Sequence, residues 1–234
     1  SFAPGAGVVF DSAIDEIVLL LGSGDDTVHV DASGQDVFVH GGAGYDAVTV
    51  GLLPGIASGV IATFTVEEVS LLDHGTAPTA WELSDMQAPG HLPLNNSRLF
   101  VDGRLILKTH EAAQSAIYLG PADDVVSVLD VNHETWINTG DGDDEIRVGC
   151  SDVAAYKTLD DLAAPLVIAG GGGTDTIALI DVEDGTAGTE TAVVSGSWVS
   201  GFGMAESAAV EHEGCERMEI IASDPGGYDI AVQS

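Results

Sequence analysis

Short runs of alternating apolar and polar residues recur along the chain, each just after a turn that contains glycine and aspartate. Thr27-Val28-His29-Val30 and Glu145-Ile146-Arg147-Val148 are two examples. Strict alternation that includes β-branched residues is typical of strands with one buried face. A further pattern, Asp102-Gly103 between two apolar runs, predicts a hairpin over residues 98–106. The sequence therefore predicts an all-β protein built from short strands.

The Gly-Asp turns recur at a regular spacing. Asp26 and Asp46 are twenty residues apart, Asp124 and Asp144 are again twenty apart, and Asp175 belongs to a fifth copy. Other turn residues lie midway between paired turns, so that turn, strand, turn and strand fill one period. Such a period is typical of stacked repeats. We expect a parallel β-solenoid (β-helix-like or β-roll-like) with coils of about twenty residues and irregular β insertions, in which successive Gly-Asp turns lie side by side.

A longer period is superimposed on the short one. Residues 21–50 resemble residues 119–148, and residues 215–232 resemble residues 14–30. We therefore expect three parts: a first solenoid module over residues 1–112, a second over residues 113–214, and the start of a third copy over residues 215–234. The chain has the pattern of modules taken from a longer array.

The composition restricts the partners. The chain has 38 Asp and Glu against 6 Lys and Arg, a net charge of −32, and 45% apolar residues. Nucleic acid is excluded as a partner, because phosphates are neutralised by Lys and Arg. No apolar stretch reaches the ~20 residues of a membrane span. Cations are the expected partners, although a negative surface also suits adaptation to high salt.

The turns resemble the G-G-x-G-x-D-x-U-x calcium-binding repeats of RTX-type β-roll proteins, which residues 41–48 and 170–177 match fully. The longer module also resembles repeat units of very large secreted and cell-surface proteins. The resemblance implies Ca²⁺ held between stacked turns by Asp carboxylates and turn carbonyls, a ligand set that calcium prefers. The expected metal ligands are Asp26, Asp46, Asp124, Asp144 and Asp175 with Gly24, Gly44, Gly142 and Gly173; second choices are Asp25, Asp123, Asp141 and Asp143. The alternative is that Gly-Asp is simply good turn chemistry.

Other kinds of site find less support. No glycine-rich loop leads into a Lys and a helix, so a phosphate loop is excluded, and no Gly-x-Ser-x-Gly or paired-His motif appears. We expect no catalytic residues and no enzyme. The three tryptophans are expected in the core, although they could instead stack on sugars. A disulfide between Cys150 and Cys215, and glycosylation of Asn95, stay open.

The expected function is structural: a calcium-stabilised repeat domain of an extracellular or cell-surface protein, such as an adhesin, a surface layer or a secreted filament. Its expected partners are calcium and neighbouring modules or identical subunits, which the open strand edges of a solenoid can bind. The alternative is a carbohydrate-binding or carbohydrate-modifying β-helix. An exposed groove with aromatic and basic residues around a carboxylate would favour that alternative.

Overall fold

The structure is a computed structural model in which every described element is a strand, twenty in all. The described part of the chain contains no helix of the length and hydrophobicity that a membrane crossing needs. Asn95 lies outside the described residues. The structure describes residues 14–31, 34–52, 60–73, 75–77, 79–84, 96–101, 104–110, 112–150, 158–182, 189–223 and 227–233.

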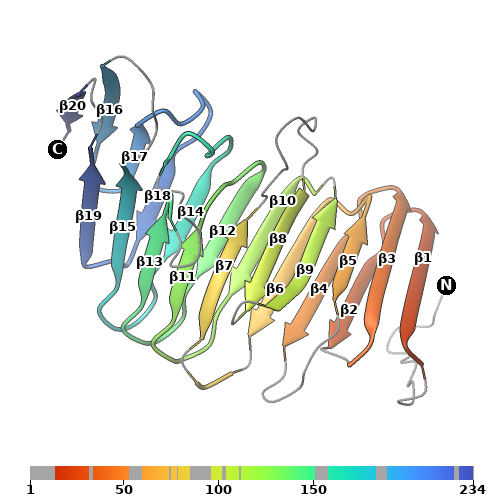
Figure 1. Ribbon diagram of the computed structural model, residues 1–234. Helices are drawn as coiled ribbons and strands as arrows, with labels where there is room; N and C mark the ends of the chain where they lie inside the picture. Colours follow the sequence, from red (N-terminus) through yellow and green to blue (C-terminus); the bar gives the residue numbers. More distant parts are fainter. Residues whose placement is uncertain are drawn as a thin grey trace.

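The strands form two sheets of ten, which lie as two layers in Figure 1. In spatial order, sheet A contains β1 (Glu16–Ser23), β3 (Asp36–Ala43), β5 (Ile61–Phe64), β9 (Arg104–His110), β8 (Asn96–Val101), β7 (Ala80–Ser84), β11 (Val125–Val128), β13 (Glu145–Val148), β15 (Thr176–Asp181) and β19 (Arg217–Ala222). Sheet B contains β2 (Thr27–Asp31), β4 (Ala47–Leu52), β6 (Glu68–Asp73), β10 (Gln114–Tyr118), β12 (Glu134–Asn138), β14 (Leu166–Ala169), β18 (Val210–Glu213), β17 (Trp198–Gly201), β16 (Glu190–Val194) and β20 (Tyr228–Val232).

Most neighbouring strands are parallel and in register with the sequence period. The chain passes from sheet A to sheet B and back, so that β1 pairs with β3 and β2 pairs with β4. Glu16 lies opposite Asp36 and Thr27 lies opposite Ala47, which is the twenty-residue offset of the turns. The all-β class and the predominance of parallel pairing are therefore confirmed.

The core lies between the two sheets and follows from the alternation. Val37 and Val39 of β3 face inward against Val48 and Val50 of β4, and all four are at most 2% exposed. Side chains of a strand alternate between its two faces, so each apolar-polar run buries one row. Each fully buried side chain of this size contributes about 1.5–3 kcal/mol, which holds the layers together.

Two antiparallel meanders interrupt the parallel order. Strands β7, β8 and β9 form one meander in sheet A, and strands β16, β17 and β18 form the other in sheet B. The β8–β9 pair is the hairpin that Asp102-Gly103 predicts, which is confirmed. Each meander adds two strands to its sheet, and because the two meanders lie in different sheets, both sheets end with ten strands.

The order of strands recurs after nine strands, with the two sheets exchanged. Strands β1 to β9 run A, B, A, B, A, B and then the meander in A; β10 to β18 run B, A, B, A, B, A and then the meander in B. Strands β19 and β20 begin the order again. The exchange arises because nine is odd, so each unit starts in the sheet that the previous unit did not.

Candidate functional site

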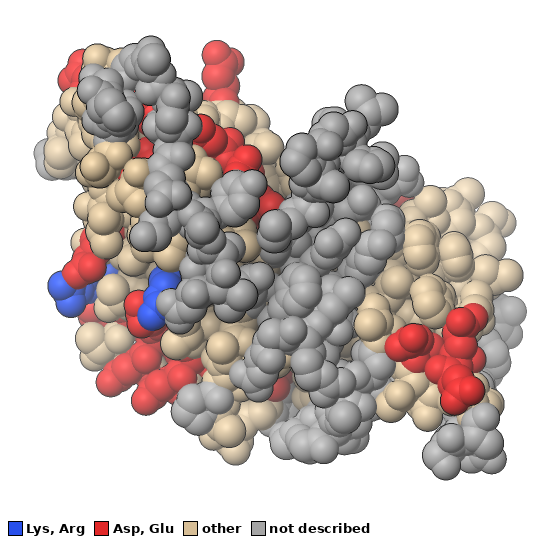
Figure 2. Space-filling view, in the orientation of Figure 1, with Lys and Arg blue, Asp and Glu red and all other residues tan. Residues whose placement is uncertain are grey.

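The Gly-Asp turns stack in two columns at opposite edges of the molecule. The first column consists of turns 24–26, 44–46 and 65–67, which lead from sheet A to sheet B; the second consists of turns 119–124, 139–144, 170–175 and 214–216, which lead from sheet B to sheet A. The strands that lead into the first column belong to sheet A and run in one direction. The strands that lead into the second column belong to sheet B and run in the other direction, so the two columns lie at opposite ends of the strands (Figure 1). Figure 2 shows acidic side chains gathered at the lower left edge, where the second column lies.

The paired glycines of each turn are required by backbone conformation and by close stacking. Gly42 and Gly44 have φ angles of 105° and 136°, in the region that glycine tolerates. A Cβ at Gly42 would overlap the carbonyl oxygen of Gly22, and one at Gly44 would overlap that of Gly24. The carbonyl groups of Gly22 and Gly24 therefore point along the column towards the next turn. The same holds for Gly142 beneath Gly173 in the second column.

The aspartate that ends each turn forms an inner ladder of hydrogen bonds. Its Oδ1 accepts the backbone N–H of the equivalent residue in the preceding turn, as Asp46 does from Asp26 at 3.0 Å. In the second column Asp144 accepts from Asp124 at 2.7 Å, and Asp175 accepts from Asp144 at 3.0 Å. Bonds from an N–H to a charged acceptor contribute about 1.5–3 kcal/mol each. The inner ladder therefore ties together turns whose curvature interrupts regular sheet pairing.

The residue just before this aspartate forms a second, outer ladder, in which its carboxylate accepts an N–H from the following turn instead of the preceding one. Asp25 Oδ1 accepts the N–H of Tyr45 at 2.9 Å, Asp123 Oδ1 accepts that of Asp143 at 2.9 Å, and Asp143 Oδ1 accepts that of Thr174 at 2.9 Å. An Asp-Asp pair thus contacts both neighbouring turns, one carboxylate in each direction. Asp141 lies on the surface of its turn and is exposed.

Each inner ladder ends at a glutamate that the sequence analysis missed. Glu67 Oε2 accepts the N–H of Asp46 at 2.8 Å, and Glu216 Oε2 accepts that of Asp175 at 2.7 Å. These last turns are shorter. His40 lies opposite Phe64, yet five residues lie between His40 and Asp46 and only two lie between Phe64 and Glu67. The longer glutamate side chain spans the gap that the shorter turn leaves.

Burial perturbs the carboxylates of the inner ladder. Asp46, Asp124, Asp144 and Asp175 are at most 2% exposed, and the second oxygen of each makes no hydrogen bond of good geometry, although Trp81 lies beside Asp124 and Thr139 beside Asp144. Burial raises the pKa of Asp124 to about 6, and the neighbouring Asp144 adds to the rise. Burial raises the pKa of Asp144 and of Asp175 as well. Asp26, at the open end of the first column, is only half-buried.

The first glycine of the full repeat has a separate role beside these carboxylates. A Cβ at Gly41 would lie 2.6 Å from Oδ2 of Asp46, and one at Gly170 would lie 2.5 Å from Oδ2 of Asp175. Glycine is therefore needed where the buried carboxylate packs directly on the backbone. The other turns of the repeat have Leu21, Leu119 or Thr139 at this position.

The geometry uses many of the expected calcium ligands for other bonds. Oδ1 of each buried aspartate already accepts an N–H, and the carbonyls of Gly24 and Gly142 point along the columns. Among the described residues, no three His, Cys, Asp or Glu side chains are arranged as metal ligands. The buried Oδ2 atoms and the exposed carboxylates of the turns remain available to a cation, and calcium stays a prediction.

The remaining candidates lie apart from the columns. Cys150 and Cys215 are not joined by a disulfide. Trp81 is buried as expected, but Trp136 is 49% exposed on the outer face of sheet B, which corrects the expectation that it belongs to the core. There its indole N–H donates to Glu134 Oε1 at 2.8 Å.

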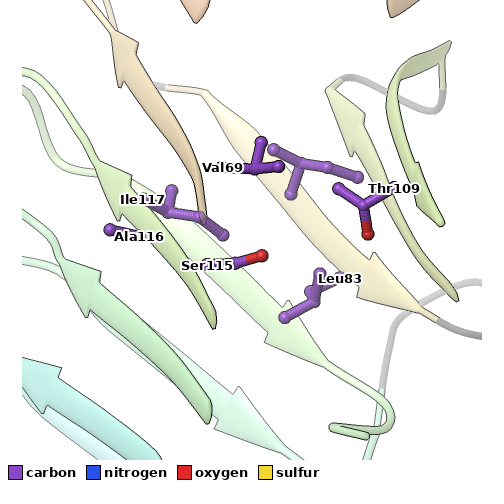
Figure 3. Close-up of a pocket in the computed structure, with 7 residues that line it drawn as sticks. Val69, Leu83, Thr109, Ser115, Ala116 and Ile117 are labelled. Atoms are coloured by element: carbon purple, nitrogen blue, oxygen red, sulfur yellow. The ribbon is translucent and has the colours of Figure 1, made fainter. Parts of the chain in front are cut away.

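A small cavity of about 20 Å³ lies between the sheets next to the first meander (Figure 3). Val69, Leu83 and Ile117 line it, together with the hydroxyl-bearing Thr109 and Ser115. Ser115 Oγ lies 2.7 Å from Nε2 of His133, and both residues are buried. The cavity has room for about one water molecule, so it is a packing gap rather than a substrate pocket.

No protein-family model matches the chain, and no curated protein or solved structure matches it either. The resemblance to RTX-type repeats therefore rests on the turn residues alone, above all residues 41–48 and 170–177.

Proposed function

We propose that the chain is a structural repeat domain, a two-sheet parallel β-solenoid that acts as a rigid spacer in an extracellular or cell-surface array. The observation that carries the proposal is the nine-strand order, which recurs with the sheets exchanged and begins a third time at β19. In repeat folds each unit contacts its neighbours only, so length can be extended without a new core. A spacer needs this property.

The chemistry of the polar residues supports a structural role. The aspartates that sequence singles out accept backbone N–H groups in two ladders, which stabilises the turns. The buried Ser115–His133 pair borders a cavity that holds about one water molecule and leaves no room for a substrate. The carboxylates of the two ladders therefore bind the backbone of the protein itself.

A deletion tests the spacer proposal. Removing residues 114–216 takes out one nine-strand unit and joins Ala113 to Arg217, so that β19 takes the place of β10. We expect the shortened chain to keep a β-type circular dichroism spectrum and cooperative thermal unfolding. Loss of structure in the shortened chain would contradict the repeat architecture.

Calcium stabilisation is the second part of the proposal, favoured by the four buried Oδ2 atoms that make no hydrogen bond of good geometry. A cation beside them would offset the repulsion between stacked carboxylates, and binding to the folded state alone would raise stability by mass action. Thermal unfolding in EDTA and in millimolar calcium, with magnesium as the control, tests this part. A calcium-selective rise in melting temperature supports it, and equal curves in all three solutions contradict it.

Carbohydrate binding is a second candidate function because of one surface feature. Trp136 on β12 and Tyr118 on β10 are 49% and 44% exposed, and both lie on the outer face of sheet B. Exposed aromatic rings next to the acceptor Glu134 suit stacking on a sugar. Trp136 fluorescence during titration with soluble polysaccharides, compared with Trp136→Ala, tests this candidate; unchanged fluorescence with every polysaccharide would contradict it.

A further inference from the structure

The two ends of the strand stack are open in the same way. Among the described strands, β1 and β2 have a neighbour on one side only, and so do β19 and β20 at the far end (Figure 1). Each end presents one strand from each sheet, because the two meanders add equally to both sheets. Leu20 at the first end is 75% exposed, and Ile221 and Val232 at the other are 46% and 80% exposed.

The free backbone groups of the two ends in sheet A can pair with one another. The N–H of Asp36 bonds to the carbonyl of Asp15, so the backbone N–H and C=O groups of every second residue from Asp15 point to β3. The backbone groups of Glu16, Val18 and Leu20 therefore point to the free edge. At β19 the N–H of Arg217 bonds to the carbonyl of Asp175. Alternate residues from Arg217 thus face β15, and residues 218, 220 and 222 face the free edge. A parallel ladder between β19 and β1 therefore places Arg217 or Glu219 opposite Glu16 or Val18.

Sheet B fits in the same way. The N–H of Ala47 bonds to the carbonyl of Asp26, which leaves the backbone of His29 facing the free edge of β2. The N–H of Glu190 bonds to the carbonyl of Gly227, so Asp229 faces β16 and its neighbours face outward. A parallel ladder between β20 and β2 therefore places Asp229 opposite Thr27 or His29. Inward-facing apolar residues then meet inward-facing apolar residues in both sheets.

The sequence similarity of the two ends selects one register. Residues 215–232 resemble residues 14–30. In the parallel strand pairs of the structure, equivalent residues of the repeat lie opposite each other, as Glu16 does with Asp36. This register sets Arg217 opposite Glu16 and the exposed Ile221 opposite the exposed Leu20. Arg217 already donates to Glu219 within its own strand, and in this register Glu16 is a second acceptor for its guanidinium. The 6 basic residues of the chain are outnumbered by 38 acidic ones, so an arginine at this position is a specific feature.

We propose that a second copy of this chain docks end to end, with β1 and β2 of one copy extending sheets A and B beyond β19 and β20 of the other. The proposal rests on the structural role proposed above. The contact is heterologous and head to tail, so it leaves a free end after each addition and builds a linear assembly. Each copy carries a net charge of −32, so the contact forms best in salt, which screens their repulsion.

Engineered cysteines test the contact directly. Directly opposite residues in neighbouring strands are about 4.8 Å apart, within the Cα separation that a disulfide spans. The double variant Leu20→Cys/Ile221→Cys, oxidised at about 0.5 M salt, should give a ladder of covalent oligomers on a non-reducing gel. Each single variant alone should stay monomeric, and an equal mixture of the two should give one covalent dimer. The parent chain, with its native Cys150 and Cys215, is the control.

The contradicting results are distinct from a failure of the spacer proposal. Covalent dimers of a single variant alone would mean that like ends meet. A monomeric double variant with an intact β spectrum would mean that the ends do not meet. Both results overturn the docking and leave the deletion result standing.

A charge exchange gives an independent readout by sedimentation velocity. Glu16→Arg and Arg217→Glu should each weaken association several-fold, and mixing the two variants should restore it. Association unaffected by either variant would overturn the proposed register.

Discussion

Replacement of Asp144 by Asn removes one buried charge from the second column and keeps the oxygen that accepts the N–H of Asp124 at 2.7 Å. The Asn side-chain nitrogen would take the place of Oδ2, which lies beside Thr139. Thr139 Oγ1 donates to the carbonyl of Gly170 at 2.8 Å, so its oxygen is available to accept from the new amide. The variant therefore satisfies both ends of the side chain without a charge.

The expected effect is a gain in stability at neutral pH without calcium. The stacked carboxylate of Asp175 is about 5 Å away, one strand spacing, and two charges at that distance repel by roughly 1–3 kcal/mol at the effective dielectric of a site near a protein surface. Loss of the charge on the acceptor weakens the bond from Asp124 by about 1 kcal/mol. The net gain is about 0–2 kcal/mol, and for a chain of this size each kcal/mol raises the melting temperature by about 2–4 °C.

The assay is thermal unfolding by circular dichroism at pH 7.5 in EDTA and low salt. Asp141→Asn is the matched control, since it removes the same charge from an exposed position of the same turn and should change stability by less than about 0.5 kcal/mol. A lower melting temperature for Asp144→Asn in EDTA would refute the reasoning. It would mean that the charged carboxylate stabilises the column more than its burial and repulsion destabilise it.

Three further predictions concern the same turns. Gly42→Ala should destabilise by several kcal/mol more than Gly24→Ala, because both have a positive φ but only a Cβ at Gly42 meets a neighbouring carbonyl; equal denaturation midpoints in urea would contradict this. Glu216→Ala should cost about 1–2 kcal/mol by leaving the N–H of Asp175 unpaired, whereas Glu216→Gln should keep most of the stability, as calorimetry can show. A decrease in pH from 7.5 to 5 should raise the melting temperature. The pKa of Asp124 is raised from 3.8 to about 6, so the folded state takes up a proton first, and stability lost above pH 6 is regained as the pH falls. Burial lowers the pKa of two histidines, which opposes this trend below pH 6.5, so a melting temperature that falls steadily from pH 7.5 would show that the histidines dominate.

The local features of the fold could be predicted because they depend on short segments. Alternation predicted the strands, the twenty-residue spacing predicted that Asp26 lies beside Asp46, and Asp102-Gly103 predicted the β8–β9 pair. The exchange of sheets could not be predicted, because it depends on the number of strands in each meander, and residues 51–118 have no clear period. Glu67 was missed because its turn has lost the glycines that mark the others.

The inner ladder was only half predictable for a similar reason. The positions of the aspartates follow from the repeat. The hydrogen-bond partner of each carboxylate depends instead on the distance between its turn and the neighbouring turn of the column. Spacing alone does not separate an oxygen that accepts an N–H from one that binds a metal ion. The exposed Trp136 shows the same limit, because its strand is amphipathic and only the pairing register shows which face is outside.

The odd number of strands in each unit also bears on the straightness of a long array. If every unit carried its acidic turns on the same edge, mutual repulsion along that edge would bow the rod away from it. The exchange of sheets puts the first column on one edge and the second on the other, so the bending forces of successive units oppose each other. In a rod assembled from pairs of such units, repulsion along one edge would therefore offset part of the repulsion along the other.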